Sequence, residues 1–221
     1  MNTVVFDMDG VLFDTEVLCL KSWQAVAARY NIQDIDSVFP SCVGRNLTDT
    51  REIVFRHYGA GFPYDEFRKA ASEWSKNWIE KNGLPMKKGV HELLSFLADQ
   101  HFRIGLASSS SYESVTDHLK RANILHYFSA IVTGDMILHS KPAPDIYLLA
   151  CEKLQSHPEE CYAIEDSPNG IRSANRAGMM PIMVPDMIAA DSEMKELSLT
   201  ILPDLLAVKS YFIFRTKDYL Q

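Results

Sequence analysis

Cysteine is scarce in this sequence, and the arrangement of the few cysteines excludes the common cysteine-based sites. The chain has four, with no CxxC spacing among them: Cys19, Cys42, Cys151 and Cys161. Structural zinc sites and thioredoxin-like redox sites use paired cysteines at that spacing. We therefore expect buried, free thiols, which are usual in proteins of a reducing compartment.

Basic charge is also in short supply. The formal net charge is −7 and the sequence pI is about 5.5. A protein of this charge is repelled by the phosphates of nucleic acids and by anionic membrane surfaces, so neither is expected as a main partner. A local cationic pocket for a small anion remains compatible with the sequence.

Long apolar runs are absent as well. No segment approaches the ~18 apolar residues that a membrane-spanning helix requires. The N-terminal MNTVVF has no basic segment, and Asp7 and Asp9 interrupt the apolar run that it begins, so we expect no signal peptide. These features predict a cytoplasmic protein.

What the sequence does have is an alternation of strand-like and helix-like segments. Its 221 residues suffice for one large domain, or for a core with an insertion. Short apolar segments typical of strands lie at Thr3–Phe6, Phe102–Ala107, Ala130–Thr133, Tyr162–Ile164, Met180–Val184 and Leu199–Ile201. Helical patterns lie between all successive strands except the last two, and the expected helices outside residues 16–84 span Val90–Gln100, Tyr112–Ala122, Pro144–Leu154 and Gly170–Ala177. This pattern predicts an α/β fold, a parallel sheet with helices on both faces.

Residues 16–84 interrupt this alternation. Apolar side chains there recur at spacings of three and four, which indicates amphipathic helices, and no strand pattern is present. We expect an all-helical insertion at 16–84 in a core made of residues 1–15 and 85–221. Trp23, Trp74 and Trp78 follow the helical spacing, so packing between helices explains them better than a substrate platform does.

The stretch VVFDMDGVLFD, residues 4–14, places two carboxylates just beyond the first expected strand. Carboxylates at the end of a buried strand are unfavourable unless a partner compensates them. A calcium-binding loop is excluded because Val11 and Leu12 replace the required polar residue and glycine. The remaining alternatives are a turn at Asp9-Gly10, or a nucleophile at Asp7 with a proton carrier at Asp9.

Polar residues follow two further strands. Ser108 and Ser109 end the second strand and are either a flexible serine linker or a hydroxyl with backbone N–H groups that bind a phosphate oxygen. Lys141 precedes an expected helix and is either a surface lysine or a cation that neutralises a phosphate and a carboxylate together.

Glu165 and Asp166 directly follow the strand Tyr162–Ile164. Ser167 or Asp166 as a helix N-cap, with Pro168 in the first turn, accounts for part of this segment. It does not account for two carboxylates at a buried strand end, whereas Mg²⁺ prefers such oxygen ligands. Because ligands collect beyond the carboxyl ends of parallel strands, we expect the four strand-end groups to form one site.

The ordered set of motifs resembles the haloacid dehalogenase superfamily. DxDGVLFDTE at 7–16, LASSS at 106–110, SKPAPD at 140–145 and EDSPNGI at 165–171 are similar to its four motifs, in order. The chain most resembles the β-phosphoglucomutase-like branch, which carries a helical cap after the first strand. The resemblance implies a Rossmann-like core with a mobile C1-type cap that closes over the active site.

The resemblance also implies roles for residues of the core. Asp7 would be the nucleophile that forms an aspartyl-phosphate, and Asp9 the general acid and base. Ser108 and Ser109 would bind the phosphoryl group, and Lys141 would bridge that group to Asp7.

The implied cofactor is Mg²⁺. Asp7 and Asp166 would bind it through their carboxylates and Asp9 through its backbone carbonyl. Glu165 would bind it directly or through water.

In the cap, the resemblance implies hinges at Thr15 and at Leu84–Lys88, and substrate contacts from Glu16, Gly44 and Arg45. Mutases of this branch usually have a histidine on the first cap helix, where this chain has Cys19. They also tend to place a lysine and an arginine near the cap-loop glycine. Aligned on Gly44, the corresponding residues are Val43 and Leu47, although Arg45 lies nearby.

These differences favour a Mg²⁺-dependent phosphatase for a small phosphomonoester, with sugar phosphates the expected class, and leave a β-phosphoglucomutase-type mutase as the alternative. A 2-haloacid dehalogenase would not need a proton donor at Asp9. A phospho-accepting signalling module would place its acceptor after a middle strand, and a non-catalytic binding protein would not require the full set of acids. The expected partner is a small phosphorylated metabolite, and the protein is taken to be a monomer.

Overall fold

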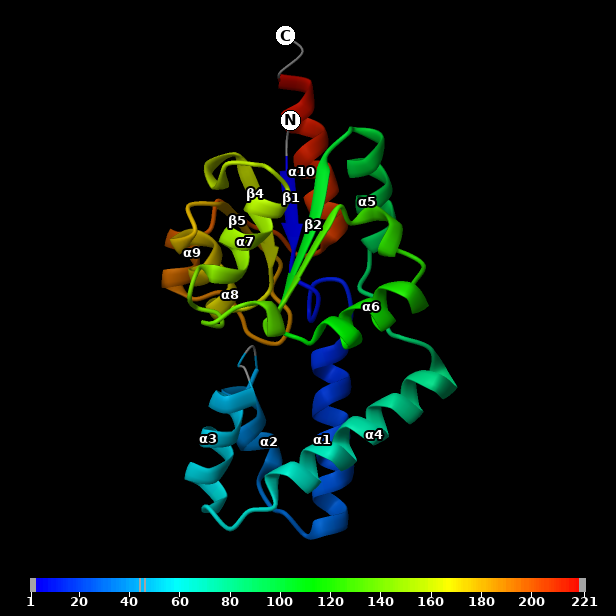
Figure 1. Ribbon diagram of the computed structural model, residues 1–221, viewed down its shortest axis with the longest axis vertical. Helices are drawn as coiled ribbons and strands as arrows, with labels where there is room; N and C mark the ends of the chain where they lie inside the picture. Colours follow the sequence, from blue (N-terminus) through cyan, green and yellow to red (C-terminus); the bar gives the residue numbers. More distant parts are fainter. Residues whose placement is uncertain (1–2, 44, 46, 219–221) are drawn as a thin grey trace. The chain divides into compact units, whose positions relative to one another are not determined.

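The computed structural model describes residues 3–43, 45 and 47–218 (Figure 1). The chain divides into two compact units, the first formed by Met1–Phe13 with Met86–Gln221 and the second by Asp14–Pro85. These boundaries lie next to the limits expected from the sequence, where the alternating pattern gives way to helices at 16–84.

The first unit contains a six-stranded sheet in the order β3-β2-β1-β4-β5-β6, in which all neighbouring strands are parallel. The strands are β1 (Thr3–Phe6), β2 (Arg103–Ser108), β3 (Ala130–Thr133), β4 (Cys161–Glu165), β5 (Met180–Met183) and β6 (Thr200–Ile201). Each predicted strand begins and ends within one residue of an observed strand. The strand β1 lies at the centre, between β2 and β4 (Figure 1).

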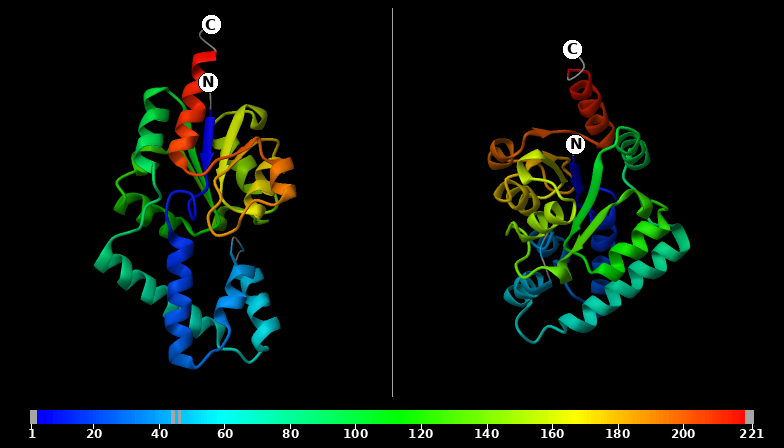
Figure 2. Two further views of the ribbon diagram at one scale, coloured as in Figure 1. Left: turned by 180° about the vertical axis from the view of Figure 1, so that it is seen from behind. Right: turned by 45° about the horizontal axis from the view of Figure 1, so that its top comes forward.

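Helices cover both faces of this sheet. They are α5 (Val90–Asp99), α6 (Tyr112–Arg121), α7 (Asp145–Lys153), α8 (Pro168–Arg176), α9 (Ser192–Leu197) and α10 (Leu205–Asp218), with short 3₁₀ turns at Leu125–Tyr127, Gly134–Met136 and Pro158–Glu160. On one face, α7 packs on β2 and β3, and α8 on β4 and β5. On the other, α5 and α10 lie side by side (Figure 2, left). The sequence prediction of a doubly covered parallel sheet is confirmed.

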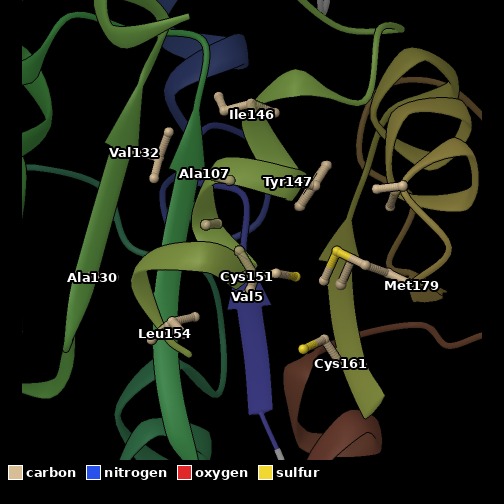
Figure 3. Packing of buried hydrophobic residues seen from close by; sticks show 14 residues of the cluster. Val5, Ala107, Ala130, Val132, Ile146, Tyr147, Cys151, Leu154, Cys161 and Met179 are labelled. Atoms are coloured by element: carbon tan, nitrogen blue, oxygen red, sulfur yellow. The ribbon is translucent and has the colours of Figure 1, made fainter. Parts of the chain in front are cut away.

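The alternation of side chains along β4 shows why both faces are covered. Ala163 belongs to the buried cluster on the face that α7 covers. Val5 of β1 lies in the same cluster, near Cys151 (Figure 3). The neighbouring Tyr162 points to the opposite face and meets Phe212 of α10 at a ring-centroid distance of 5.0 Å. A strand buried on both sides reads as a continuous apolar run, which is how these strands appear in the sequence.

Local signals set the bounds of α8. The Ser167 side chain accepts a hydrogen bond from the backbone N–H of Gly170 (3.1 Å), and Pro168 occupies the first turn. At the other end Gly178 adopts φ +81°, and its N–H donates to the carbonyl of Asn175 (2.9 Å). Glycine enters this left-handed region at little steric cost, so the helix stops there. The capping interpretation of Ser167 is therefore correct.

The second unit is helical in the part that the structure describes. Its helices are α1 (Thr15–Tyr30), α2 (Ile35–Val38), α3 (Leu47–Tyr58) and α4 (Tyr64–Asn82), with a 3₁₀ turn at Phe39–Ser41. Trp23 is 6% exposed and meets the rings of Phe39 and Phe67 edge-on, so it belongs to the core of this unit as expected. Trp74 and Trp78 are half-buried.

Two α-helices of the first unit, α9 and α10, were not predicted. In α10 the apolar residues lie all around the helix, so that Phe212 is buried while Phe214 is 69% exposed, and no one-sided pattern marks it.

None of the four cysteines, all of which lie within the described residues, forms a disulfide; Cys42, Cys151 and Cys161 are buried, whereas Cys19 is only half-buried, contrary to the prediction. Cys19 lies on α1, where the sequence pattern alone did not separate the buried face from its edge. Among the described residues, none of the helices combines the length and apolar character that crossing a membrane demands.

Candidate active site

The polar residues at the strand ends come together because β1 has β2 and β4 as its neighbours. Phe6, the last residue of β1, is in register with Leu106 of β2 and with Ile164 of β4. The backbone N–H of Asp7 still donates to the carbonyl of Ile164 (2.9 Å), so the Asp7 side chain is held at the edge of the sheet. Ser108, Glu165 and Asp166 emerge at the same edge, as parallel topology requires.

Asp7, Glu165 and Asp166 form a cluster of carboxylates. One oxygen of each lies within 4.8 Å of the others, and all three residues are buried. Such a set of oxygens is the donor chemistry that Mg²⁺ prefers. The turn after β1 makes room for the cluster: a Cβ on Gly10 would lie 2.4 Å from Oδ2 of Asp166. The residues present therefore fit a hard divalent cation.

Lys141 is the cation of the site and is 5% exposed. Its Nζ donates to Oδ1 of Asp7 (2.5 Å), to Oε1 of Glu165 (2.6 Å) and to the carbonyl of Ala107 (3.0 Å). Burial lowers the pKa of the ammonium, but the Asp7 and Glu165 carboxylates outweigh burial and raise it above its usual value. Lys141 is therefore charged at neutral pH, and the interpretation as a surface lysine is wrong.

Burial acts in the opposite direction on Asp7. It raises the pKa of this carboxyl well above its usual value, with further contributions from Glu165 and Asp9, while Lys141 opposes the rise. A divalent cation bound at the cluster would oppose this rise, because nearby positive charge favours the ionised form of a carboxyl.

The two oxygens of Glu165 are both engaged by protein groups. Oε1 accepts from Lys141 Nζ and from the hydroxyl of Tyr147 (2.8 Å). Oε2 accepts from the N–H groups of Asp166 (3.1 Å) and Ser167 (3.3 Å) and from the Ser167 hydroxyl (3.2 Å). Gly170 packs so closely that a Cβ there would lie 1.8 Å from Cδ of Glu165. This carboxylate is fixed from every side.

The serine run turns sharply after β2, so the linker interpretation is wrong. Ser108 is fully buried, and its hydroxyl accepts from the N–H of Ser110 (3.1 Å). The carbonyl of Ser110 accepts from the N–H of Gly134 (3.0 Å), and a Cβ on Gly134 would lie 2.3 Å from the carbonyl oxygen of Ser109. A hydroxyl that accepts one hydrogen bond keeps its O–H as a donor for a phosphate oxygen.

Asp9 is half-buried and stands apart from the acidic cluster. Its Oδ2 accepts from the Ser110 hydroxyl (3.0 Å), and the turn that carries it is closed by the N–H of Gly10, which donates to the carbonyl of Phe13 (2.8 Å). A carboxyl that is partly exposed and oriented by a hydroxyl is suited to proton transfer.

Ser110, Tyr147 and His118 are the polar residues of this region that the sequence analysis did not single out. Burial lowers the pKa of the His118 imidazole while the Asp9 carboxylate opposes this effect, and the His118 ring meets Phe13 edge-on. Ser110 belongs to the serine run, which could have flagged it. Tyr147 is the third residue of α7 and looks like an ordinary apolar helix position, so nothing in the sequence pattern marked it.

The residues expected to contact substrate, Glu16, Gly44 and Arg45, and the expected hinge residue Thr15 belong to the second unit. Thr15 and Glu16 occupy the first turn of α1 and are half-buried. Arg45 is exposed, and its N–H donates to the carbonyl of Cys42 (3.1 Å). Gly44 lies outside the described residues. The roles given to these four residues remain predictions.

Comparison with known proteins matches the chain to one family along most of its length. The model of a family described as haloacid dehalogenase-like hydrolase matches residues 4–184. The phosphorylated carbohydrates phosphatase of Thermotoga maritima is 31% identical over 179 residues, which are 81% of this chain and 82% of that protein. The β-phosphoglucomutase of Bacillus subtilis is 31% identical over 207 residues, 90% of this chain and 91% of that protein.

Similarity extends to solved structures. The crystal structure of CbbY from Rhodobacter sphaeroides in complex with phosphate superposes with a TM-score of 0.79 at 25% identity, covering 93% of this chain and 95% of that one. The shared fold includes the sheet whose edge carries the acidic cluster described above.

Proposed function

The chain belongs to the haloacid dehalogenase-like hydrolase family, and we propose that it is a Mg²⁺-dependent phosphatase that hydrolyses a small phosphomonoester through an aspartyl-phosphate on Asp7. The observation that carries this proposal is the contact of Lys141 Nζ with Asp7 Oδ1 (2.5 Å) inside a buried cluster of carboxylates. A cation and an acidic cluster around one carboxylate provide what phosphoryl transfer requires, namely positioning and compensation of oxygen charge.

The first step forms a bond between an Asp7 oxygen and phosphorus and breaks the ester P–O bond. The departing alkoxide takes a proton from Asp9, which the Ser110 hydroxyl orients. Lys141 and Ser108 bind the oxygens of the phosphoryl group as it moves to Asp7. Asp7, Asp166 and the backbone carbonyl of Asp9 would hold Mg²⁺, which would supply charge stabilisation for the transferring group.

The second step releases phosphate. Asp9 is now a carboxylate. It accepts a proton from a water molecule while the oxygen of that water molecule attacks phosphorus. The bond between phosphorus and the Asp7 oxygen breaks, orthophosphate leaves, and the Asp7 carboxylate is restored. Asp9 therefore acts once as an acid and once as a base, and the cycle closes without net proton loss from the protein.

A sugar phosphate is the favoured substrate class. Support comes from the relatives, because the matched Thermotoga maritima protein is named as a phosphatase of phosphorylated carbohydrates and the Bacillus subtilis protein as a β-phosphoglucomutase. Hydrolysis is favoured over mutase activity because Val43 and Leu47 replace the cationic residues of the mutases. A mutase must keep its bisphosphate intermediate bound while the intermediate reorients in the active site. Fewer cationic side chains bind the phosphate groups of that intermediate more weakly.

The test is phosphate release from a panel of sugar phosphates and from p-nitrophenyl phosphate, with Mg²⁺ and with EDTA. We expect turnover that requires Mg²⁺, and β-glucose 1-phosphate is assayed separately for conversion to glucose 6-phosphate. Conversion without phosphate release would assign the mutase activity instead. Halide release from a 2-haloacid, with no phosphate release from any ester, would overturn the proposal.

Asp7→Asn tests the nucleophile. The variant keeps the shape of the side chain but replaces the nucleophilic carboxylate by a neutral amide. Phosphate release should therefore disappear, while urea unfolding remains cooperative. Asp99→Asn, on the exposed end of α5, is the matched control and should keep wild-type turnover. Retained turnover in Asp7→Asn would exclude the aspartyl-phosphate mechanism.

A further inference from the structure

Tyr147 is a fully buried tyrosine whose hydroxyl is directed at the active site from beneath it. It lies on α7, which packs on β2 and β3, and its side chain is 0% exposed (Figure 3). The hydroxyl donates to Oε1 of Glu165 (2.8 Å). The ammonium of Lys141 lies 5.1 Å from the centre of its ring. Tyr147 thus touches the two residues that stand behind Asp7.

Packing requires only the ring of Tyr147, so the hydroxyl needs a separate explanation. A phenylalanine ring would fill the same apolar space, whereas a buried hydroxyl is unfavourable unless it is hydrogen-bonded. Glu165 can only accept hydrogen bonds when ionised, so the tyrosine must be the donor. Burial and the nearby Glu165 raise the pKa of the Tyr147 hydroxyl well above its usual value, so it keeps its proton at neutral pH.

Lys141 and Tyr147 share one acceptor atom. Both donate to Oε1 of Glu165, at 2.6 Å and 2.8 Å, while three groups of the β4–α8 turn donate to Oε2. The position of Oε1 therefore sets where Lys141 Nζ lies, and that nitrogen also contacts Asp7. With both oxygens engaged in this way, Glu165 acts as an anchor for the lysine.

We infer that Tyr147 is a positioning residue for phosphoryl transfer: its hydroxyl fixes the Glu165 carboxylate, and through it the Lys141 ammonium against Asp7. The inference rests on the proposed function for its effect on the reaction. Neither Tyr147 nor Glu165 exchanges a proton or forms a bond in the proposed reaction. They act by keeping Lys141 at the place where charge develops on the phosphoryl oxygens. Small displacements of such a group lower the rate because the stabilisation depends on its preset position.

Tyr147→Phe is the test variant, and Tyr162→Phe is its matched control. Tyr162 is also a buried tyrosine, on β4, but its hydroxyl accepts from Arg215 (3.3 Å) and takes no part in the cluster. With p-nitrophenyl phosphate and saturating Mg²⁺, we expect Tyr147→Phe to lower kcat by roughly tenfold and to change KM by less than about twofold, as the loss of one hydrogen bond to a charged group predicts.

Binding of phosphate analogues separates positioning from a general loss of structure. Orthovanadate adopts the five-coordinate geometry of the transition state, whereas inorganic phosphate resembles the product. In Tyr147→Phe, calorimetry with Mg²⁺ should show orthovanadate binding weakened by roughly tenfold and phosphate binding by less than about threefold. Equal weakening of both ligands, or wild-type kcat, would overturn the positioning role, as would the same losses in Tyr162→Phe.

A double-mutant cycle with Glu165→Gln decides the anchoring contact without any assay of activity. The effect of Tyr147→Phe on the unfolding equilibrium in urea should be at least about threefold smaller in the Glu165→Gln background, because the charged acceptor is already gone. Additive effects would refute the contact. If the wild-type protein neither releases phosphate nor binds orthovanadate, the proposed function fails, and this cycle still decides whether Tyr147 anchors Glu165.

Discussion

At the scale of single residues, Asp7 and Asp9 show how position separates two identical side chains. Asp7 follows the strand directly, is buried, and contacts Lys141. Asp9 is two residues further on, is half-buried, and accepts from the Ser110 hydroxyl. In the proposed reaction, the first carboxylate attacks phosphorus and the second transfers the proton.

Asp9→Asn should lower kcat by roughly 10²–10⁴-fold, the usual effect of removing a general acid or base. The measurement is steady-state phosphate release from the best sugar phosphate of the panel. Ser110→Ala is the companion variant, because it keeps the carboxylate and removes only its hydrogen-bond donor, so its loss should be clearly smaller. A kcat for Asp9→Asn equal to that of the wild type would show that another group carries the proton.

His118 makes stability depend on pH. Burial lowers the pKa of its imidazole, and the opposing effect of the Asp9 carboxylate is smaller. The unfolded chain therefore binds a proton more readily than the folded protein does, and the free energy of unfolding falls as the pH drops below the unfolded pKa of about 6.5.

His118→Gln should remove this contribution, which is at most about 1.4 kcal/mol per pH unit for a single proton. Urea unfolding at pH values of about 7.5 and 5.5 measures it, since this range spans the unfolded pKa of histidine. The difference in stability between the two pH values should be smaller in His118→Gln than in the wild type. His91→Gln, an exposed position on α5, is the control; an unchanged difference in His118→Gln would contradict the assignment.

At the scale of elements, the turn between β4 and α8 does two jobs. Ser167 caps the helix through its hydroxyl, and the same hydroxyl donates to Oε2 of Glu165. Gly170 in the first turn of the helix lets the Glu165 side chain pass close to the backbone. The helix start and the anchor of the active site are therefore built by one short segment, and a change in one should disturb the other.

Gly170→Ala tests this coupling. The added Cβ would lie 1.8 Å from Cδ of Glu165, so the carboxylate or the first turn of α8 must shift. Although alanine is the better helix former, we expect a loss of stability of roughly 1–3 kcal/mol, typical of overpacking in a core, together with a lower kcat. Urea unfolding and phosphate release measure the two effects.

Gly61→Ala is the matched control for this prediction, because a Cβ there meets no atom within 4 Å. It should leave stability within about 0.5 kcal/mol of the wild type, as surface substitutions generally do. If Gly170→Ala were as stable as the wild type or more stable, the added Cβ would be accommodated without loss of unfolding free energy, and the prediction would be wrong.

At the scale of the whole molecule, the first unit is interrupted by the second and yet carries the entire acidic cluster with Lys141. The two chain crossings lie side by side, because the N–H of Asp14 donates to the carbonyl of Pro85 (2.9 Å) and Phe13 pairs with Met86. The chain thus leaves the first unit after Phe13 and returns to it at Met86, and these two residues are neighbours in space.

A chain in which residues 14–85 are replaced by a turn of about two to four residues, a length typical of tight connections, should therefore fold. We expect cooperative urea unfolding with a smaller m-value, since less surface is buried, and retained binding of orthovanadate with Mg²⁺. Circular dichroism and calorimetry measure both properties. Loss of cooperative unfolding would mean that the first unit depends on the second for its stability.

The strand-end residues illustrate what could be predicted from the sequence. Apolar runs followed by Asp7, Ser108 and Glu165-Asp166 are local patterns, and parallel topology obliges their carboxyl ends to meet. Tyr147 and Ser110 were missed because each matters through a hydrogen bond to a residue far away in the sequence. Tyr147 and its partner Glu165 are 18 residues apart, and Ser110 and its partner Asp9 are 101 residues apart. No local pattern encodes such a contact.

By itself, therefore, the sequence determined the α/β class, the strands nearly to the residue, the helical insertion, and the identity of the acids, the serine and the lysine. Burial periodicity and turn chemistry are properties of neighbouring residues, which is why they can be read without coordinates. Only the tertiary structure decided that Lys141 points inward, that Glu165 is held through both of its oxygens, and that Cys19 is half-buried. The first two facts depend on how residues next to α7, β2 and β4 pack together at the edge of the sheet, and the third depends on how α1 packs in the second unit. Packing is a property of the folded chain and not of neighbouring residues.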